Sequence, residues 1–154
     1  MNLRGLVFAA LLVACASGWT RDFRGEVVAI ADGDTLTILV GRQQIRVRLA
    51  EIDAPERRQA YGTVARQYLA RLCFRRTAAV RVQSTDRYGR IVGRVTCAGV
   101  DANAAMVRAG LAWAYVRYLR DPQITALQRE ARQARLGLWR DADPAPPWVF
   151  RIRE

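Results

Sequence analysis

Residues 26–49 read EVVAIADGDTLTILVGRQQIRVRL, and this stretch decides the predicted fold. It contains three short runs rich in apolar residues, at 26–30, 35–40 and 45–49, and the last two alternate in polarity. Alternation is typical of half-buried strands, and the Asp-Gly pair after the first run is a strong turn signal. The stretch therefore predicts a three-stranded antiparallel meander.

Two more strands and three helices are predicted further along the chain. Strands are expected at 79–82 and 91–95, on either side of a polar turn. Apolar residues at helical spacing predict a helix over 64–74, and aspartate caps with closing glycines predict helices over 101–108 and 121–136. Five strands and about three α-helices in this order predict an α+β fold, a five-stranded OB-type β-barrel, which is a scaffold associated with oligonucleotide binding.

The composition excludes several kinds of chemistry. The chain has 154 residues, with 25 lysines or arginines, 14 acidic residues and no histidine, which gives a formal charge of +11. This length suits one compact domain, and a basic surface attracts polyanions such as nucleic acid, anionic lipid or acidic polysaccharide. Without imidazole there is no histidine general base and no histidine-bound zinc. Any hydrolysis must rest on carboxylates, an oxygen-bound metal and guanidinium groups.

The first 18 residues have the layout of a secretory signal peptide, with one early cation and an apolar run too short to cross a bilayer. Two cleavage routes stay open. The sequence around Cys15 fits an ordinary signal peptidase, and it also resembles a lipobox in which Cys15 carries a lipid anchor. Either route predicts an exported protein, periplasmic or secreted. The mature chain is then expected to have an OB domain at 19–140 and a Pro-rich tail at 141–154. Within the tail, residues 141–147 are not expected to form regular structure.

Two cysteines remain if Cys15 is removed or lipidated. These are Cys73 and Cys97, separated by 97 − 73 = 24 residues. An even pair in an exported domain predicts a disulfide. Two buried free thiols are the alternative.

Three acidic clusters carry the candidate chemistry. Asp32 and Asp34 flank a turn, Asp53 and Glu56 follow the third strand, and Asp86 begins a basic turn. Each cluster alone is also explained as a turn or as a helix start. In a meander the start of the second strand lies near the end of the third, so we expect Asp34 and Asp53 to meet on one rim. Oxygen ligands of this kind favour Ca²⁺ or Mg²⁺.

The order of three motifs resembles the staphylococcal nuclease (thermonuclease) family. The motifs are Asp-Gly-Asp-Thr at 32–35, Arg-x₄-Asp-x-Pro-Glu at 48–56 and Asp-x-Tyr-Gly-Arg at 86–90, and the resemblance extends over residues 24–139. The fold of that family is an OB barrel, which agrees with the strand pattern. The resemblance implies a Ca²⁺-dependent endonuclease that hydrolyses DNA or RNA to 3′-phosphate-ended products.

The resemblance also implies a role for each matching acid. Asp34 and Asp53 take the positions of the Ca²⁺-ligating carboxylates, with the carbonyl of Ala54 as a backbone ligand and Asp32 as a nearby acid. Glu56 matches the general base. Ala54 stands where the family member used for comparison has threonine, and this departure bears on metal affinity more than on mechanism.

Two arginines and several pocket residues complete the implied site. Arg48 and Arg90 match the pair that grips the scissile phosphate. The positions that flank the nucleotide pocket correspond to Arg87, Tyr88 and Tyr115, with Tyr118 as a rival to Tyr115. Tyrosines beside the pocket favour single-stranded or frayed DNA and RNA as partners.

Two other functions compete with the nuclease. A noncatalytic nucleic-acid-binding OB module would keep the groove, but this chain retains every matched catalytic position. A basic lipoprotein tethered to an anionic envelope would explain the charge and the leader and none of the three motifs. We therefore expect an enzyme, acting as a monomer with no obligate protein partner.

Overall fold

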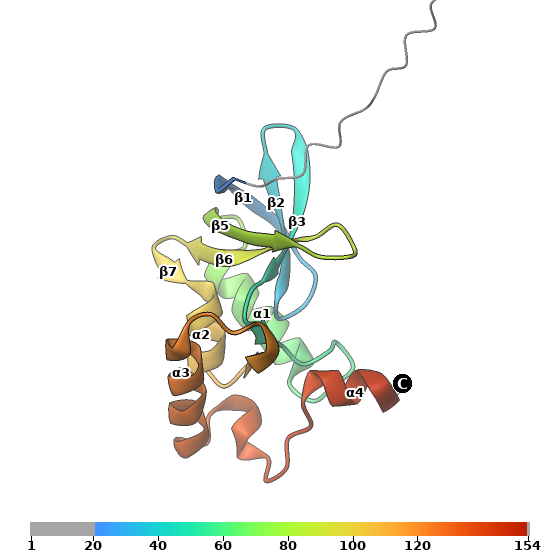
Figure 1. Ribbon diagram of the computed structural model, residues 1–154, viewed down its shortest axis with the longest axis vertical. Coiled ribbons are helices and arrows are strands. Elements are labelled where there is room, and N and C mark those ends of the chain that lie inside the picture. Colours follow the sequence, from blue (N-terminus) through green and yellow to red (C-terminus); the bar gives the residue numbers. More distant parts are fainter. Residues whose placement is uncertain (1–20, 154) are drawn as a thin grey trace, which may run out of the picture.

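The strands of the computed structural model, which describes residues 21–153, close into a barrel (Figure 1). β1 (Phe23–Ile30), β2 (Thr35–Val40) and β3 (Gln43–Leu49) form the predicted antiparallel meander. β5 (Thr77–Thr85) and β6 (Ile91–Cys97) form a hairpin that pairs through β5 with β1. Parallel pairing of β6 with β3 closes the barrel. The predicted five-stranded α+β OB-type fold is confirmed.

Within residues 21–153, four α-helices gather towards one end of the barrel (Figure 1), and the chain also forms three short strands and two 3₁₀ helices. The helices are α1 (Gly62–Cys73), α2 (Ala102–Arg108), α3 (Pro122–Gln133) and α4 (Pro147–Arg153). The short elements are β4 (Ile52–Asp53), β7 (Val100–Asp101), β8 (Trp113–Ala114), η1 (Val116–Tyr118) and η2 (Gly137–Arg140).

Three of these helices lie where the sequence predicts them. Asp101 caps α2 by accepting a hydrogen bond from the backbone N–H of Ala104, and Asp121 caps α3 in the same way. The fourth helix, α4, is not predicted, because its short segment falls in the Pro-rich tail. It begins at Pro147, so the prediction of no regular structure over 141–147 is wrong at residue 147, while residues 141–146 have no helix or strand, as expected.

The core is built from the apolar side chains that alternate along the strands. Val27, Leu36, Val47 and Leu49 are fully buried, and Leu69 of α1 packs into the same cluster. This arrangement leaves polar residues of the strand ends on the rim of the barrel, where the candidate site lies.

Cys73 at the end of α1 and Cys97 at the end of β6 form a disulfide, as predicted, and both are fully buried. The predicted leader at 1–18 and its Cys15 lie outside the described residues. Within residues 21–153, no helix is long and apolar enough to cross a membrane.

Replacing both Cys73 and Cys97 with alanine should lower the free energy of unfolding by about 3 kcal/mol, because the crosslink restricts the unfolded chain. Urea denaturation measures this difference. Reduction with dithiothreitol should destabilise the wild type and leave the double variant unchanged. Equal stability of the oxidised wild type and the double variant would contradict a structural role for the bond.

Candidate active site

Two acidic segments meet at the rim of the barrel because of the register between β2 and β3. Thr35 lies opposite Arg48, and the backbone N–H of Leu49 donates to the carbonyl of Asp34 at 2.8 Å. The backbone N–H of Ala54 then donates to Asp34 Oδ2 at 2.9 Å. The turn that carries Asp34 is thereby fixed to the segment that follows β4.

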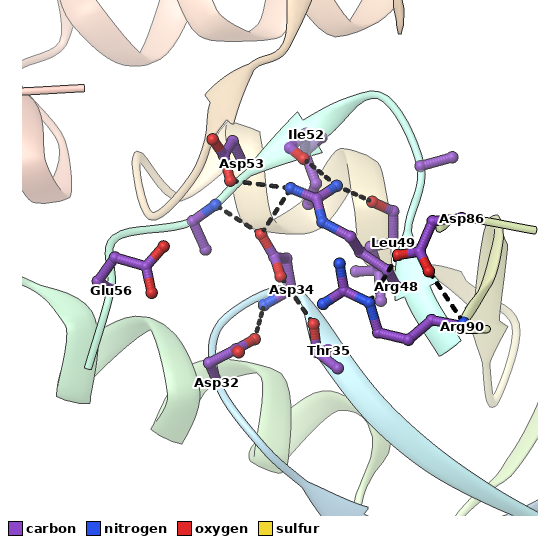
Figure 2. A network of polar contacts seen from close by, with 12 residues as sticks. Asp32, Asp34, Thr35, Arg48, Leu49, Ile52, Asp53, Glu56, Asp86 and Arg90 are labelled. Carbon is purple, nitrogen blue, oxygen red and sulfur yellow. Dashed lines mark hydrogen bonds and ion pairs between the residues drawn. The ribbon is translucent and has the colours of Figure 1, made fainter. Parts of the chain in front are cut away.

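Arg48 lies between the two carboxylates that the sequence analysis paired (Figure 2). Its Nη2 is 2.8 Å from Asp53 Oδ1 and 3.4 Å from Asp34 Oδ2, while Nη1 donates to the carbonyl of Ile52 at 3.1 Å. Burial alone would lower the pKa of Arg48, but the charges of Asp34 and Asp53 outweigh it and raise the pKa. Arg48 is therefore held as a cation.

Two of the acids near Arg48 ionise less readily than ordinary aspartates. Burial and the neighbouring charge of Asp34 raise the pKa of Asp32 to about 7, although Asp32 Oδ1 accepts a hydrogen bond from the backbone N–H of Asp34. Burial also raises the pKa of Asp53 above its ordinary value, against the effect of its hydrogen bond with Arg151. Both shifts indicate carboxylates that are crowded together.

Arg151 is part of this site, and the sequence analysis missed it. It extends from α4, with its Nη2 at 2.7 Å from Asp53 Oδ2 and its Nη1 at 2.6 Å from Glu56 Oε1. The only local signal for this helix is a proline followed by apolar residues, and no motif marks the arginine. Arg151 thus bridges the predicted metal ligand and the predicted general base.

The second predicted phosphate-binding arginine, Arg90, does not touch these acids. It enters β6 beside β3, and its Nε donates to Asp86 Oδ2 at 2.7 Å. Asp86 also accepts hydrogen bonds from the backbone N–H groups of Tyr88 and Arg90. Burial would raise the pKa of Asp86, but the side-chain hydrogen bond from Arg90 and these backbone hydrogen bonds outweigh it and lower the pKa. Within residues 21–153 the two terminal nitrogens of Arg90 make no hydrogen bond or ion pair, so they can receive an anion.

The predicted pocket residues lie in two places. Arg87 and Tyr88 are at the exposed tip of the β5–β6 hairpin, where Arg87 Nη2 donates to the Tyr88 hydroxyl at 2.6 Å. Tyr115 and Tyr118 contact each other edge to face, with ring centroids 5.1 Å apart. The Tyr115 ring also stacks on Trp148 of α4 and is half-buried, whereas Tyr118 is exposed.

One acid of the second cluster faces another region. Glu51 is buried, and its carboxylate accepts hydrogen bonds from the Gln83 side chain and from the backbone N–H groups of Arg120 and Asp121. Burial would raise its pKa, but these hydrogen bonds lower it. Glu51 therefore anchors the loop before α3 to the barrel.

The donor set around Arg48 fits a hard divalent cation in type and in charge. It consists of carboxylate and carbonyl oxygens. Four carboxylates lie near the guanidiniums of Arg48 and Arg151, namely those of Asp32, Asp34, Asp53 and Glu56. If all four carboxylates are ionised, an excess of 4 − 2 = 2 negative charges remains. Among the described residues, however, no three acidic, cysteine or histidine side chains are grouped to hold a metal, so such an ion would also need backbone, water or substrate oxygens.

Most of this chain is similar in sequence to known proteins. Residues 46–141 match the model of the family described as staphylococcal nuclease homologue. A protein named micrococcal nuclease from Shigella flexneri is 48% identical over 97% of this chain and 91% of its own length. A protein named uncharacterized endonuclease from Escherichia coli is 46% identical over 86% of this chain and 88% of its own length. Staphylococcal-like nuclease CAN1 from Arabidopsis thaliana is 38% identical over 71% of this chain and 34% of its own length.

Arg48→Met should lower the free energy of unfolding by about 3 kcal/mol, because it leaves two buried carboxylates without their shared cation. Arg46→Met is the matched control, since Arg46 lies on the same strand and is exposed. Urea denaturation of the three proteins measures the difference. Equal losses in both variants would show that Arg48 does not hold the acids together.

Asp86→Asn should lower the free energy of unfolding at neutral pH by about 1–3 kcal/mol, because it removes a charge-assisted hydrogen bond. The pKa of Asp86 is lowered in the folded state, so its contribution is present above the ordinary aspartate pKa and is lost as pH falls through the lowered value. The stability gap between wild type and variant should therefore shrink below about pH 4. A gap that is constant from pH 7 to pH 3 would contradict this account.

Proposed function

The chain belongs to the staphylococcal nuclease family, and from this premise we propose that it is a Ca²⁺-dependent endonuclease. The proposed reaction is hydrolysis of the phosphodiester bonds of DNA or RNA to 3′-phosphate-ended products. The observation that best supports it is the meeting of Asp34 and Asp53 at one guanidinium, with Glu56 three residues beyond Asp53.

A metal is part of this proposal, because nucleases of the family are generally metal-dependent. Asp34 and Asp53 would hold Ca²⁺ together with the carbonyl of Ala54, as the resemblance implies. A bound Ca²⁺ would supply Lewis-acid polarisation of the phosphate and offset its charge. If all four carboxylates are ionised, the two unbalanced negative charges of the acid cluster favour a divalent ion over a monovalent one.

The chain's own residues would carry the proton and the phosphate. Glu56 accepts a proton from the attacking water, whose oxygen forms the new bond to phosphorus. The bond from phosphorus to the 5′ oxygen breaks, and that oxygen leaves with a proton from solvent. Arg48 and Arg90 stabilise the negative charge that develops on the phosphoryl oxygens. Asp86 holds Arg90 by Nε, which leaves the planar pair of terminal nitrogens for two of those oxygens.

Substrate preference follows from the exposed aromatic residues near the site. Tyr88 is 67% exposed beside Arg87 and Arg90, and Tyr118 is 56% exposed. Aromatic faces stack on unpaired bases of any sequence, so we propose single-stranded or frayed DNA and RNA as substrates. The net positive charge would add salt-sensitive attraction to the backbone.

We also propose that the protein works outside the cytoplasm, in the periplasm or as a secreted or lipid-anchored protein. The Cys73–Cys97 disulfide supports this location, because such bonds persist in oxidising compartments. The leader-like segment before residue 19 supports it independently.

Arg90→Ala and Glu56→Gln should each lower kcat about 10²- to 10³-fold on denatured DNA with Ca²⁺, because each removes a group that acts in the transition state. Arg46→Ala, an exposed arginine of β3, should retain wild-type rates. Single-turnover cleavage of a labelled oligonucleotide measures these values, and chelation of Ca²⁺ should abolish cleavage.

Three results would contradict the proposal. Cleavage that is equal with and without chelator would exclude the metal role. Full activity of Arg90→Ala would exclude the assigned role of that arginine. Calcium-independent binding of the oligonucleotide without any cleavage would instead support the noncatalytic nucleic-acid-binding module.

A further inference from the structure

We propose that the C-terminal helix α4 is an internal substrate mimic that covers the active site until Ca²⁺ and nucleic acid displace it. This inference rests on the proposed function. Two side chains of α4, one turn apart, each occupy a place that the reaction needs. Arg151 lies on the acids, and Trp148 lies on Tyr115, one of the two tyrosines predicted for the pocket.

Arg151 occupies the place of a cation. Asp53 accepts hydrogen bonds from Arg151 through both of its carboxylate oxygens, at 3.3 and 2.7 Å. Glu56 Oε1 accepts a hydrogen bond from Nη1 of the same guanidinium at 2.6 Å. A carboxylate bound in this way has fewer free lone pairs for a metal, and the Glu56 oxygen that Arg151 contacts is not free to bind water. Arg151 and Ca²⁺ therefore compete for Asp53.

Trp148 occupies the place of a nucleobase. Its ring is stacked on Tyr115, with centroids 5.5 Å apart and an angle of 11° between the planes. This parallel arrangement is the one that an unpaired base adopts on an aromatic side chain. The second contact of Trp148 is edge to face with Trp113, which lies beneath it at 5.7 Å. A base could stack on this face of Tyr115 only after Trp148 moves.

The attachment of α4 is suited to displacement. A segment without helix or strand, residues 141–146, connects it to the rest of the chain, and Gln59 donates to the carbonyl of Ala145 at 2.6 Å. A hollow of about 220 Å³ lies against this segment, lined in part by Tyr61, Trp113 and Phe150. On the outer side of α4, Ile152 is 84% exposed. The helix lies beside the loop before α1, apart from α2 and α3 (Figure 1).

The charges also favour exchange over permanent closure. The side chain of Arg151 is 40% exposed, so its ion pairs are partly screened by solvent. A divalent ion brings twice the charge of a guanidinium to the same buried carboxylate. A phosphodiester offers Arg151 a new anionic partner once the helix has moved.

Calorimetric titration of Ca²⁺ into wild type, Arg151→Met and Arg140→Met tests the competition without any use of catalysis. Arg151→Met keeps the apolar stem of the side chain and should bind Ca²⁺ at least about tenfold more tightly, because the ion no longer displaces a charge-assisted hydrogen bond. Arg140 is exposed on η2, so Arg140→Met should match wild type.

Hydrogen exchange of the full chain tests the displacement. Peptides covering α4 should exchange faster when Ca²⁺ and a nuclease-resistant phosphorothioate oligothymidylate are added together, whereas peptides covering α3 should not change. Trp148→Ala should bind the same oligonucleotide more tightly than wild type does, because Tyr115 is then free to stack.

The outcomes separate this inference from the proposed function. Equal Ca²⁺ affinity in wild type and Arg151→Met, together with Ca²⁺-dependent cleavage, would overturn the role of α4 alone. Weaker Ca²⁺ binding by Arg151→Met, or slower exchange of α4 with ligand, would overturn it by showing that α4 completes the site. No Ca²⁺ binding by any of the three proteins would overturn both.

Discussion

Asp34 and Asp53 are buried side chains from two segments of the chain, and Arg48 contacts both of them. Carboxylates that are removed from water lose hydration and repel each other, so a fold holds them together where a cation offsets their charge or where their pKa rises. The pairing of β2 with β3 places that cation opposite Thr35, next to Asp34. The strand register that closes the core thus also sets the electrostatics of the site.

The remaining charge determines what the site can accept. With Asp32 and Glu56 included, the carboxylates outnumber the guanidiniums around them, and a phosphodiester would be repelled from the acids themselves. A cation at Asp53 removes this repulsion. The terminal nitrogens of Arg90 lie apart from the acids, fixed by Asp86, and can attract phosphate at once. Arg48 is already paired with the acids, whereas the terminal nitrogens of Arg90 are left for an anion.

The sequence predicted the parts of this site that depend on local pattern. Alternation along β2 and β3 gives the meander, and the meander brings Asp34 near Asp53. Arg151 contacts Glu56 and Asp53, which precede it by 95 and 98 positions in the sequence. These contacts depend on how a seven-residue helix docks after a Pro-rich segment. Short helices of this kind have too few residues for a period to be recognised. The Asp-x-Tyr-Gly-Arg motif could have predicted the pairing of Arg90 with Asp86, because the two residues are four positions apart. Their separation from Asp34 and Asp53 depends on how the barrel closes, which no local motif encodes.

The small residues around Asp34 pack closely, and Ala54 takes part in that packing. Gly33 does not have a positive φ, so the turn does not require glycine for its backbone conformation. A Cβ at Gly33 would instead lie 2.7 Å from the Cβ atoms of both Ala54 and Ala65, which means that glycine is needed for close approach. Threonine at position 54 would add two heavy atoms beside this contact. Alanine keeps the turn close, and its backbone N–H still donates to Asp34, so the carboxylate is positioned without the hydroxyl.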